Sequence, residues 1–467
     1  MPNETKEVFD VCVVGGGISG LSVAAFMALQ HNKKVLLLEK NDTIGGVLQN
    51  SNDQNTVRDH AANGWLDSEE SVQELLRLVG LEKQTIQADA TSKKRWLIHQ
   101  EKLHALSPKI LFSRLLPITT IFRVVKEIFR MQSTDPTISL AECMEERFGS
   151  DIVPILISPM AAGVYACEAE KLCVREAFPN IWNLVKKGSL IRNMIQQMRK
   201  KKTSPKLTTL QGGTAMLCRS IAQRLSKNIR TKQHVTSAQY NSTVQLWALS
   251  VSAIQDTTST VLAKNLVLCC PAREQATILE KELEKDADMH TVAHALSAVQ
   301  YNPVVVVIHE FKKSDFVEIP VGFGALCTKE SQQTGILGIL FTSNIFPSHS
   351  SGDILITRTI MGGSICPNML DKTDMELQHI SLEMHQKLFH SPLLQSQRQT
   401  VIRHRLGIPQ YDTQHISLHE HVRELHKNYP HLRLSGNHLF GVAIKDTIRN
   451  SKEIATHFAN KDNHHST

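Results

Sequence analysis

The chain has 467 residues, of which 41% are hydrophobic and 21% charged, and it carries a formal net charge of +7. This length exceeds one simple core and indicates roughly two or three domains, while the composition excludes a disordered chain. Aromatic residues are scarce and no basic stripe lies within a known motif, which argues against nucleic acid as a partner; the basic balance favours anionic partners such as phospholipid head groups or polycarboxylates.

The cysteines and the hydropathy of the sequence indicate the cellular location to expect. Nine cysteines occur without a C-x-x-C pair, so we expect reduced thiols in the cytoplasm rather than a disulfide framework, and no metal site. No stretch reaches the roughly 18 uncharged apolar residues that a spanning helix needs, and the N-terminus lacks the pattern of a secretory signal. Any membrane contact is therefore expected to be peripheral.

The first forty residues predict a strand–helix–strand unit. Residues 8–14 (VFDVCVV) are an apolar run typical of a buried parallel strand. Residues 18–31 have helical spacing, and residues 34–38 form a second strand that ends before Glu39. Together they make one βαβ unit.

The turn of this unit, Gly15-Gly16-Gly17-Ile18-Ser19-Gly20, contains G-x-G-x-x-G. Because it follows a strand, opens a helix and is followed by Glu39 at the next strand tip, it predicts a dinucleotide site. Gly15 permits the tight turn, Gly17 lets the backbone approach a pyrophosphate, and Gly20 lets helix and strand pack closely. The helix N-terminus favours the pyrophosphate, and Glu39 accepts hydrogen bonds from ribose hydroxyls. A second glycine pair, Gly45-Gly46, follows Glu39 and favours FAD over NAD.

The middle of the chain is expected to be mostly helical. Residues 68–79 predict a helix stopped by Gly80, and a capping box at Ser139 and Glu142 predicts another. Between them, apolar residues recur at helical spacing from Ile118 to Phe129, with basic residues interleaved. This amphipathic face either packs inside the protein or lies in a membrane interface, and the sequence leaves both open.

The second half alternates strands and helices. A strand at 264–270 is stopped by Pro271, and residues 300–362 are rich in short apolar strands. Helices are predicted near 374–390 and from about Thr447 onward.

An ordered set of segments carries a family resemblance over nearly the whole chain. In chain order they are VVGGGISGLSVA, LEKNDTIGG, LVGL, LHALSP, SLAECMEERFG, GVYACEAEKLCVREAFP, LQGGTAMLCRSIAQRL, GFGALCTKES, GILGILFTSNIFP, IMGG, RLGIPQYDTQH and LSGNHLFGVAIKDTIRNS. This set resembles the oxygen-dependent protoporphyrinogen oxidases, within the wider amine-oxidase-like flavoprotein group.

The resemblance implies an α/β fold with a Rossmann-type FAD-binding domain, an inserted β-rich substrate domain and a helical membrane-associating domain. The FAD-binding domain would be discontinuous. Its parts would be 1–90, 206–290 and 401–467, with the helical domain at 91–205 and the substrate domain at 291–400.

The resemblance also implies which residues hold FAD. Besides Gly15 to Gly20, Glu39, Gly45 and Gly46, these are Lys40, Val47, Ala61, Ala62, Asn63, Gly64, Val235, Val442, Ala443 and Ile444. Ala61 to Gly64 match the segment beside the flavin ring, Val235 the residue whose backbone meets the adenine, and Val442 to Ile444 the pyrimidine end of the ring.

Three positions depart from the family pattern. Ala61-Ala62 stands where Gly-Pro is usual, Cys167-Glu168 where Gly-Asp is usual, and Val47-Leu48 where an Arg commonly follows the glycine pair. These departures leave the flavin site in place and bear on the substrate and on catalytic competence.

The chemistry implied is FAD-dependent oxidation of protoporphyrinogen IX to protoporphyrin IX in haem biosynthesis, with dioxygen as acceptor and peroxide as product. The sequence contains no acid–base constellation, in keeping with chemistry carried by the cofactor; Asn63 is the candidate polar group near the substrate. Arg95, Arg175 and Lys445 are candidate partners for substrate propionates.

Three alternatives stay open: oxidation of coproporphyrinogen III, the chemistry of an amine oxidase or carotenoid desaturase, and a non-catalytic membrane-associated protein that keeps the flavin fold. The expected partners are a porphyrinogen, dioxygen, a membrane surface and, as a further option, a second copy in a homodimer. The expected location is the cytoplasmic face of a membrane, bound peripherally.

Overall fold

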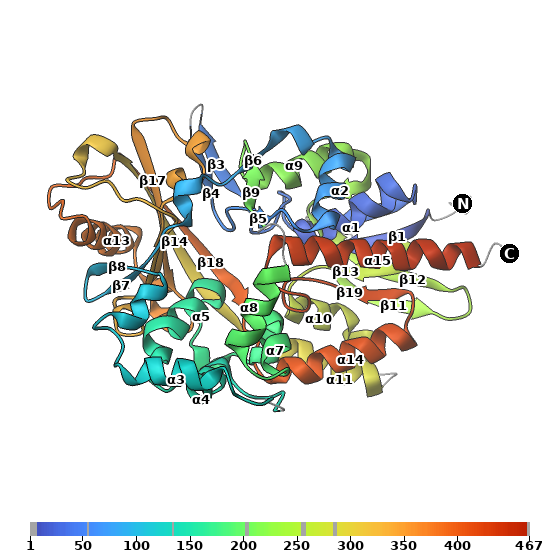
Figure 1. Ribbon diagram of the computed structural model, residues 1–467. Coiled ribbons are helices and arrows are strands. Elements are labelled where there is room, and N and C mark those ends of the chain that lie inside the picture. Colours follow the sequence, from blue (N-terminus) through green and yellow to red (C-terminus); the bar gives the residue numbers. More distant parts are fainter. Residues whose placement is uncertain are drawn as a thin grey trace.

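One half of the molecule is built on a seven-stranded sheet that contains the first strands of the chain (Figure 1). The computed structural model describes residues 7–464 except 54–55, 133–134, 201–204, 254–257 and 284–286. The strand order is β10-β2-β1-β13-β12-β11, with β19 also paired to β13. These strands are β1 (Val8–Val14), β2 (Val35–Leu38), β10 (Ile229–Arg230), β11 (Gln233–Asn241), β12 (Leu246–Ala253), β13 (Thr258–Leu268) and β19 (Leu432–Leu434).

The predicted strand–helix–strand unit is confirmed. β1 pairs in parallel with β2 on one side and with β13 on the other. Its Val11 and Val13 face one apolar core, while Cys12 and Val14 face a second core across the sheet. Burial on both faces explains why β1 is a continuous apolar run.

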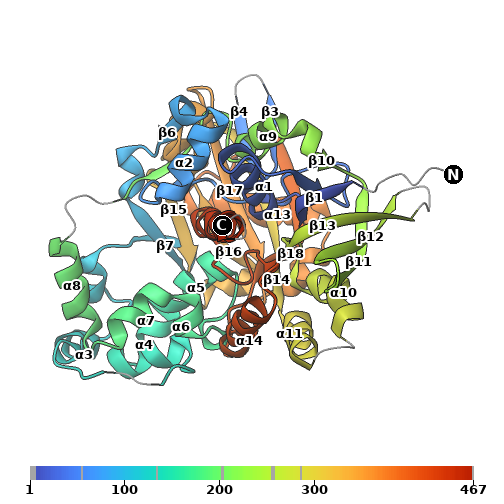
Figure 2. The ribbon, with the colours of Figure 1, turned by 90° about the vertical axis from the view of Figure 1, so that its right-hand side faces the viewer.

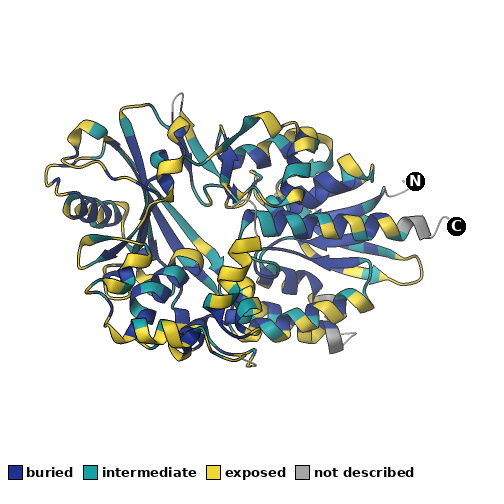
Figure 3. Cartoon of the chain, in the orientation of Figure 1, coloured by how far each residue is buried: buried dark blue, intermediate teal, exposed yellow. Residues whose placement is uncertain are grey.

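Helices cover both faces of this sheet, whose strands are buried between them (Figure 3). One face carries α1 (Ile18–Ala25), α2 (Glu70–Val79), α9 (Ala215–Arg224) and α15 (Ile444–His464). The other carries α10 (Ala272–Leu283), α11 (Ala287–Ala298) and α14 (Gln414–Asn428). As predicted, Gly80 ends α2, in the left-handed conformation.

The other half is built on a second seven-stranded sheet, ordered β18-β14-β17-β16-β15-β7-β8. Its strands are β7 (Arg95–His99), β8 (Lys102–Ala105), β14 (Tyr301–Lys312), β15 (Gly324–Cys327), β16 (Ile336–Leu340), β17 (Ile354–Gly362) and β18 (Arg398–Pro409). The apolar cores on its two faces include α13 (Asp374–Leu388) and α5 (Ser158–Tyr165).

The second sheet does not follow the domain boundaries expected from the sequence. Residues 95–105, expected in the helical domain, supply β7 and β8, and β7 pairs in parallel with β15. At the other end β18 extends past residue 400 to Pro409, while α11 packs on the first sheet although it lies beyond residue 291 for most of its length. For β7 the difference follows from its pairing with β15, more than two hundred residues away, which no local pattern encodes.

The helical part consists of α3 (Thr119–Glu127), α4 (Leu140–Phe148), α5, α6 (Val174–Ala177), α7 (Pro179–Val185) and α8 (Leu190–Lys200). The capping box at Ser139 and Glu142 is present. Glu127, at the end of α3, forms a buried ion pair with Arg147 at 2.7 Å and accepts the backbone N–H of Leu190, so it joins α3 to the start of α8. None of the helices in the described ranges combines the length and apolarity needed to cross a bilayer.

Two small sheets connect the halves. β3 (Asn50–Asp53) and β4 (Thr56–Asp59) form a hairpin, and β9 (Leu207–Leu210) pairs with β5 (Trp65–Leu66) and β6 (Thr85–Gln87). The segment between β4 and β5, residues 60–64, runs between the two sheets and returns at the cofactor site below.

Candidate cofactor-binding site

In the glycine loop after β1, two glycines are required by close packing and a third leaves room for a ligand. Gly15 has φ +109°, and a Cβ there would lie 2.9 Å from the Cys269 carbonyl carbon. A Cβ on Gly20 would lie 2.0 Å from the Gly15 oxygen, so this glycine is needed for the close turn. Gly17 differs, because its φ is −74° and a Cβ there would meet no atom within 4 Å. The loop therefore leaves open space at Gly17, in front of the helix.

Helix α1 begins directly behind this space. It has no side-chain cap and no acidic residue in its first turn, so its free N–H groups and partial positive charge are left for a ligand. A pyrophosphate is the group that such a helix end binds.

Glu39, just beyond the end of β2, is held in place by the loop. Its Oε2 accepts the Gly16 N–H at 2.6 Å, and its Oε1 accepts the Asn41 N–H at 2.8 Å. The side chain is buried. Two oxygens fixed in this way suit the recognition of neighbouring ribose hydroxyls.

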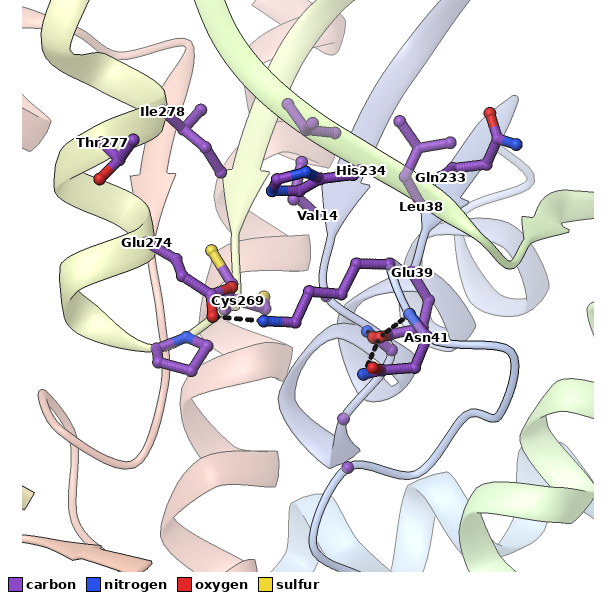
Figure 4. Close-up of a pocket in the computed structure, with 18 of the residues that line it drawn as sticks. Val14, Leu38, Glu39, Asn41, Gln233, His234, Cys269, Glu274, Thr277 and Ile278 are labelled. Carbon is purple, nitrogen blue, oxygen red and sulfur yellow. Dashed lines mark hydrogen bonds and ion pairs between the residues drawn. The ribbon is translucent and has the colours of Figure 1, made fainter. Parts of the chain in front are cut away.

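A cavity of about 400 Å³ opens from these residues (Figure 4). One wall comes from β11, with His234 and Val235, and the opposite wall from α10, with Thr277 and Ile278. Lys40 and Glu274, which both line the cavity, form an ion pair with Nζ and Oε1 2.5 Å apart. Cavities that hold nucleotides and cofactors begin at about 300 Å³.

The residues present therefore fit the adenosine and pyrophosphate of FAD. The cavity brings together seven of the residues expected to bind it: Gly15, Gly16, Gly17, Glu39, Lys40, Gly46 and Val235. The sequence reasoning missed Cys269, Cys270 and Pro271, which also line the cavity. The strand stopped by Pro271 was the available signal, because ligands of open α/β sheets bind beyond the carboxyl ends of neighbouring parallel strands.

Other expected cofactor residues lie around the loop rather than in the cavity. Ile18 packs into the core beneath α1, and the Ser19 hydroxyl lies 2.8 Å from that of Ser435. Gly45 donates its N–H to the Gly16 oxygen at 2.7 Å, which places the second glycine pair against the first. Val47 is exposed.

The segment expected beside the flavin ring is fixed from two sides. The Thr214 hydroxyl donates to the Ala62 oxygen at 3.0 Å. From the second sheet, Arg358 donates to the Ala61 oxygen and to Oδ1 of Asn63. A Cβ on Gly64 would lie 2.3 Å from the Thr208 oxygen, so this end of the segment packs tightly against β9.

Asn63, the candidate polar group near the substrate, is thus held by Arg358 through its oxygen. Its Nδ2 is buried and has no protein partner. No motif in the sequence pointed to Arg358, which lies between Thr357 and Thr359 in a strand whose other residues are mostly apolar.

The second segment expected near the ring joins two cores. Val442 packs against the core of the helical part, whereas Ile444 begins α15 and is buried in the core beneath α1. The Ala443 oxygen between them accepts the Asp446 N–H at 3.0 Å.

The candidate propionate partners lie on three different elements and are engaged there. The guanidinium of Arg95 lies over the Phe323 ring, Arg175 pairs with Glu176 at 3.1 Å, and Lys445 pairs with Asp446 at 3.2 Å. No group of three or more His, Cys, Asp or Glu side chains placed to hold a metal occurs in the described part of the chain.

Cys167 and Glu168, which depart from the family pattern, both form hydrogen bonds. The Cys167 thiol donates to Oε1 of Gln410 at 3.2 Å, and the Ser364 hydroxyl donates to Glu168. Burial raises the pKa of Cys167 to about 11, so this thiol is protonated. All nine cysteines are free.

Residues 18–457 match the family described as flavin containing amine oxidoreductase. Protoporphyrinogen oxidase 2 of Arabidopsis thaliana is 26% identical over 95% of this chain and 92% of its own length. Coproporphyrinogen III oxidase of Bacillus subtilis (strain 168) is 23% identical over 95% and 96%, respectively. Among solved structures, cyclohexylamine oxidase from Brevibacterium oxydans IH-35A superposes with a TM-score of 0.72 at 14% identity, covering 97% of this chain and 99% of that one.

Proposed function

The chain belongs to the flavin-containing amine oxidoreductases and is an FAD-dependent oxidoreductase, and we propose that it oxidises protoporphyrinogen IX to protoporphyrin IX with dioxygen as final acceptor. The observation that carries this proposal is the likeness, over 95% of the chain, to relatives named for the oxidation of porphyrinogens. The expected absence of an acid–base cluster fits a reaction of this kind.

In the proposed reaction each of three two-electron steps removes a hydride from carbon and a proton from the macrocycle, and dioxygen leaves as hydrogen peroxide. Bound FAD supplies the hydride acceptor. The chain's own residues bind and orient: the glycine loop and α1 receive the pyrophosphate, and Glu39 holds the ribose. Arg358 fixes Asn63, and with it the segment expected beside the ring.

Two of the three candidate propionate partners favour protoporphyrinogen over coproporphyrinogen III, which carries four propionates rather than two. Arg175 and Lys445 are already paired with carboxylates. Binding more propionates would require breaking these pairs, so the substrate with fewer carboxylates is the better match.

Anaerobic mixing tests the proposal. We expect protoporphyrinogen IX to bleach the flavin absorbance, air to restore it, and porphyrin fluorescence to appear in step with peroxide. Coproporphyrinogen III should react at least tenfold more slowly in kcat/KM. A purified, flavin-loaded protein that neither porphyrinogen bleaches would refute the enzymatic proposal and support the non-catalytic alternative.

We further propose peripheral contact with the cytoplasmic face of a membrane, through an apolar patch on the helical part. The patch consists of Ile118, Phe122, Val125, Phe129 and Met131 on and beside α3, and Met194, Ile195 and Met198 on α8. Phe122 is 71% exposed and Phe129 79%, so the amphipathic face expected from the sequence is turned outward.

Two observations support a lipid surface as the occupant of this patch. Lys126, Arg199 and Lys200 are exposed on the same two helices, and basic residues around an apolar face favour anionic head groups. In addition, α3 and α8 are joined at Glu127 and lie along one edge of the molecule (Figure 2), so their side chains can meet one plane.

Sedimentation with vesicles tests this contact. Phe122→Ser combined with Phe129→Ser should abolish binding to vesicles that contain an anionic phospholipid. The matched control replaces two equally exposed apolar side chains elsewhere, Val317 and Leu393 (77% and 90% exposed), with Ser and should bind normally. If the first variant instead turns a homodimer into a monomer without affecting sedimentation, the patch is a subunit interface.

A further inference from the structure

Arg358 is a buried cation in an apolar setting. It lies on β17, and its side chain is only 2% exposed. Ile356 and Ile360, its neighbours on the same face of the strand, pack in the core that contains Ala162 of α5 and Ala166, which follows this helix. Burying a guanidinium among such residues is costly unless a negative charge compensates it.

The other buried arginines are compensated. Arg58 pairs with Asp53 and Glu310, and Arg147 pairs with Glu127. Arg433 donates to carbonyls at the end of α14, His426 O at 3.2 Å among them, where the helix dipole supplies partial negative charge.

Arg358 has neither a carboxylate nor the end of a helix among its hydrogen-bond partners. Its partners are the neutral oxygens of Ala61 and Asn63, its Nε is buried without a partner, and no ion pair joins it to another described residue. Burial lowers its pKa to about 10, so it stays charged at neutral pH. Asp59 is the carboxyl that attracts Arg358, so it offsets part of the charge through space, but its Oδ1 accepts the Thr214 N–H at 3.0 Å and forms no ion pair with the guanidinium in the described part of the chain.

The charge of Arg358 lies next to the segment expected beside the flavin ring. FAD is longer than the adenosine cavity, so with its pyrophosphate at Gly17 the flavin would extend out of this cavity, past the glycine loop. Ala61 packs in the same core as Ile18 and Ile444, at the starts of α1 and α15. This packing agrees with the expected place of residues 61–63 beside the ring, and Arg358 donates hydrogen bonds to two of these residues.

We infer that Arg358 is a positioning residue that brings a positive charge, only partly offset by Asp59, to the flavin end of the site through residues 61–63, and thereby favours the addition of electrons and anions to the bound flavin. Accepting a hydride adds a pair of electrons and one proton, so the flavin gains negative charge in the step. A cation fixed nearby in a medium of low dielectric stabilises that charge without reorganisation.

This inference rests on FAD binding and not on the proposed substrate. It also differs from binding of a propionate, because the buried guanidinium offers no accessible face to a flexible carboxylate. The test therefore uses the flavin itself as the probe, and a porphyrinogen is not needed.

The experiment measures two quantities for the wild type and for each variant. One is the midpoint potential of the bound flavin, from anaerobic titration against a redox dye, and the other is the dissociation constant of the flavin–sulfite adduct. Arg358→Gln should make two-electron reduction at least tenfold less favourable, a fall of about 30 mV, and weaken sulfite binding at least tenfold. Arg358→Lys, which keeps the charge, should stay within about twofold of the wild type. The control Arg433→Gln removes a compensated buried arginine and should lower thermal stability without moving either flavin measurement.

A second variant acts in the opposite direction and covers the case in which Arg358→Gln fails to fold. Asp59→Asn removes the one negative charge near Arg358 while keeping an acceptor for Thr214, so it should raise the potential and tighten sulfite binding. The inference is overturned if Asp59→Asn leaves both measurements unchanged or lowers them, or if Arg358→Gln and Arg358→Lys shift them equally.

Discussion

Replacing Gly17 with alanine should remove FAD without harming the fold. Gly17 has a φ of −74° that alanine adopts without strain, and its Cβ would meet no protein atom within 4 Å. A Gly→Ala change at such a position stabilises the apoprotein by about 0.4–1 kcal/mol, because the unfolded chain loses freedom. The methyl group nevertheless stands where the pyrophosphate must approach the backbone.

The size of the effect follows from linkage. FAD present at about one hundred times its Kd adds about 2.7 kcal/mol to the free energy of unfolding, and a hundredfold loss of affinity reduces this gain to about 0.4 kcal/mol. Thermal unfolding with and without added FAD measures both quantities, and flavin absorbance gives the stoichiometry. The apoprotein Tm should equal or exceed that of the wild type.

Two other glycines serve as controls. Gly352→Ala also meets no atom within 4 Å but lies outside the cavity lining, so it should keep full FAD binding. Gly20→Ala places its Cβ 2.0 Å from the Gly15 oxygen and should destabilise the apoprotein itself. If Gly17→Ala purified with tightly held, stoichiometric FAD, the assignment of the loop would be wrong.

Three further predictions concern single side chains. Glu39→Gln keeps the size of the side chain but loses the charge that accepts the Gly16 N–H, so FAD affinity in a fluorescence titration should fall about tenfold (about 1.4 kcal/mol); unchanged affinity would contradict its role. Burial raises the pKa of Asp59 to about 6, so the stability that the protonated carboxyl contributes is present below about pH 4 and is lost as the pH rises through 6. The free energy of unfolding should fall by about 3 kcal/mol over this interval, and in denaturant titrations Asp59→Asn should lack this loss. Burial lowers the pKa of His438 to about 3, so the stability that the neutral side chain contributes is present above pH 6.5 and is lost as the pH falls from 6.5 to about 3. His438→Phe should therefore make the free energy of unfolding fall less between pH 6.5 and 4, and a steeper fall than in the wild type would refute this.

The βαβ unit that carries the candidate adenosine site could be predicted from sequence because its information is local. Strand β1, the glycine turn, α1 and the carboxylate after β2 fall within forty residues, and each has its own backbone or packing signature. The same holds for the capping box at Ser139, which depends on residues three apart.

The flavin end could not be predicted in the same way. Arg358 acts on Asn63 although 295 residues separate them, and nothing near either residue in the sequence marks the contact. The pairing of β7 with β15 is equally distant. For α3 the spacing of apolar residues predicted a helix correctly, but periodicity alone does not say whether the apolar face meets a core or solvent.

The order in which the chain is synthesised has a consequence for when the enzyme can acquire its cofactor. Strand β1 is synthesised well before its partner β13, and β19 follows later still. The residues that line the adenosine cavity are spread from Val14 to Leu406. A nascent chain therefore lacks part of this lining until Leu406 has been added and has left the ribosome, so FAD can enter a complete cavity only after most of the two sheets has been made.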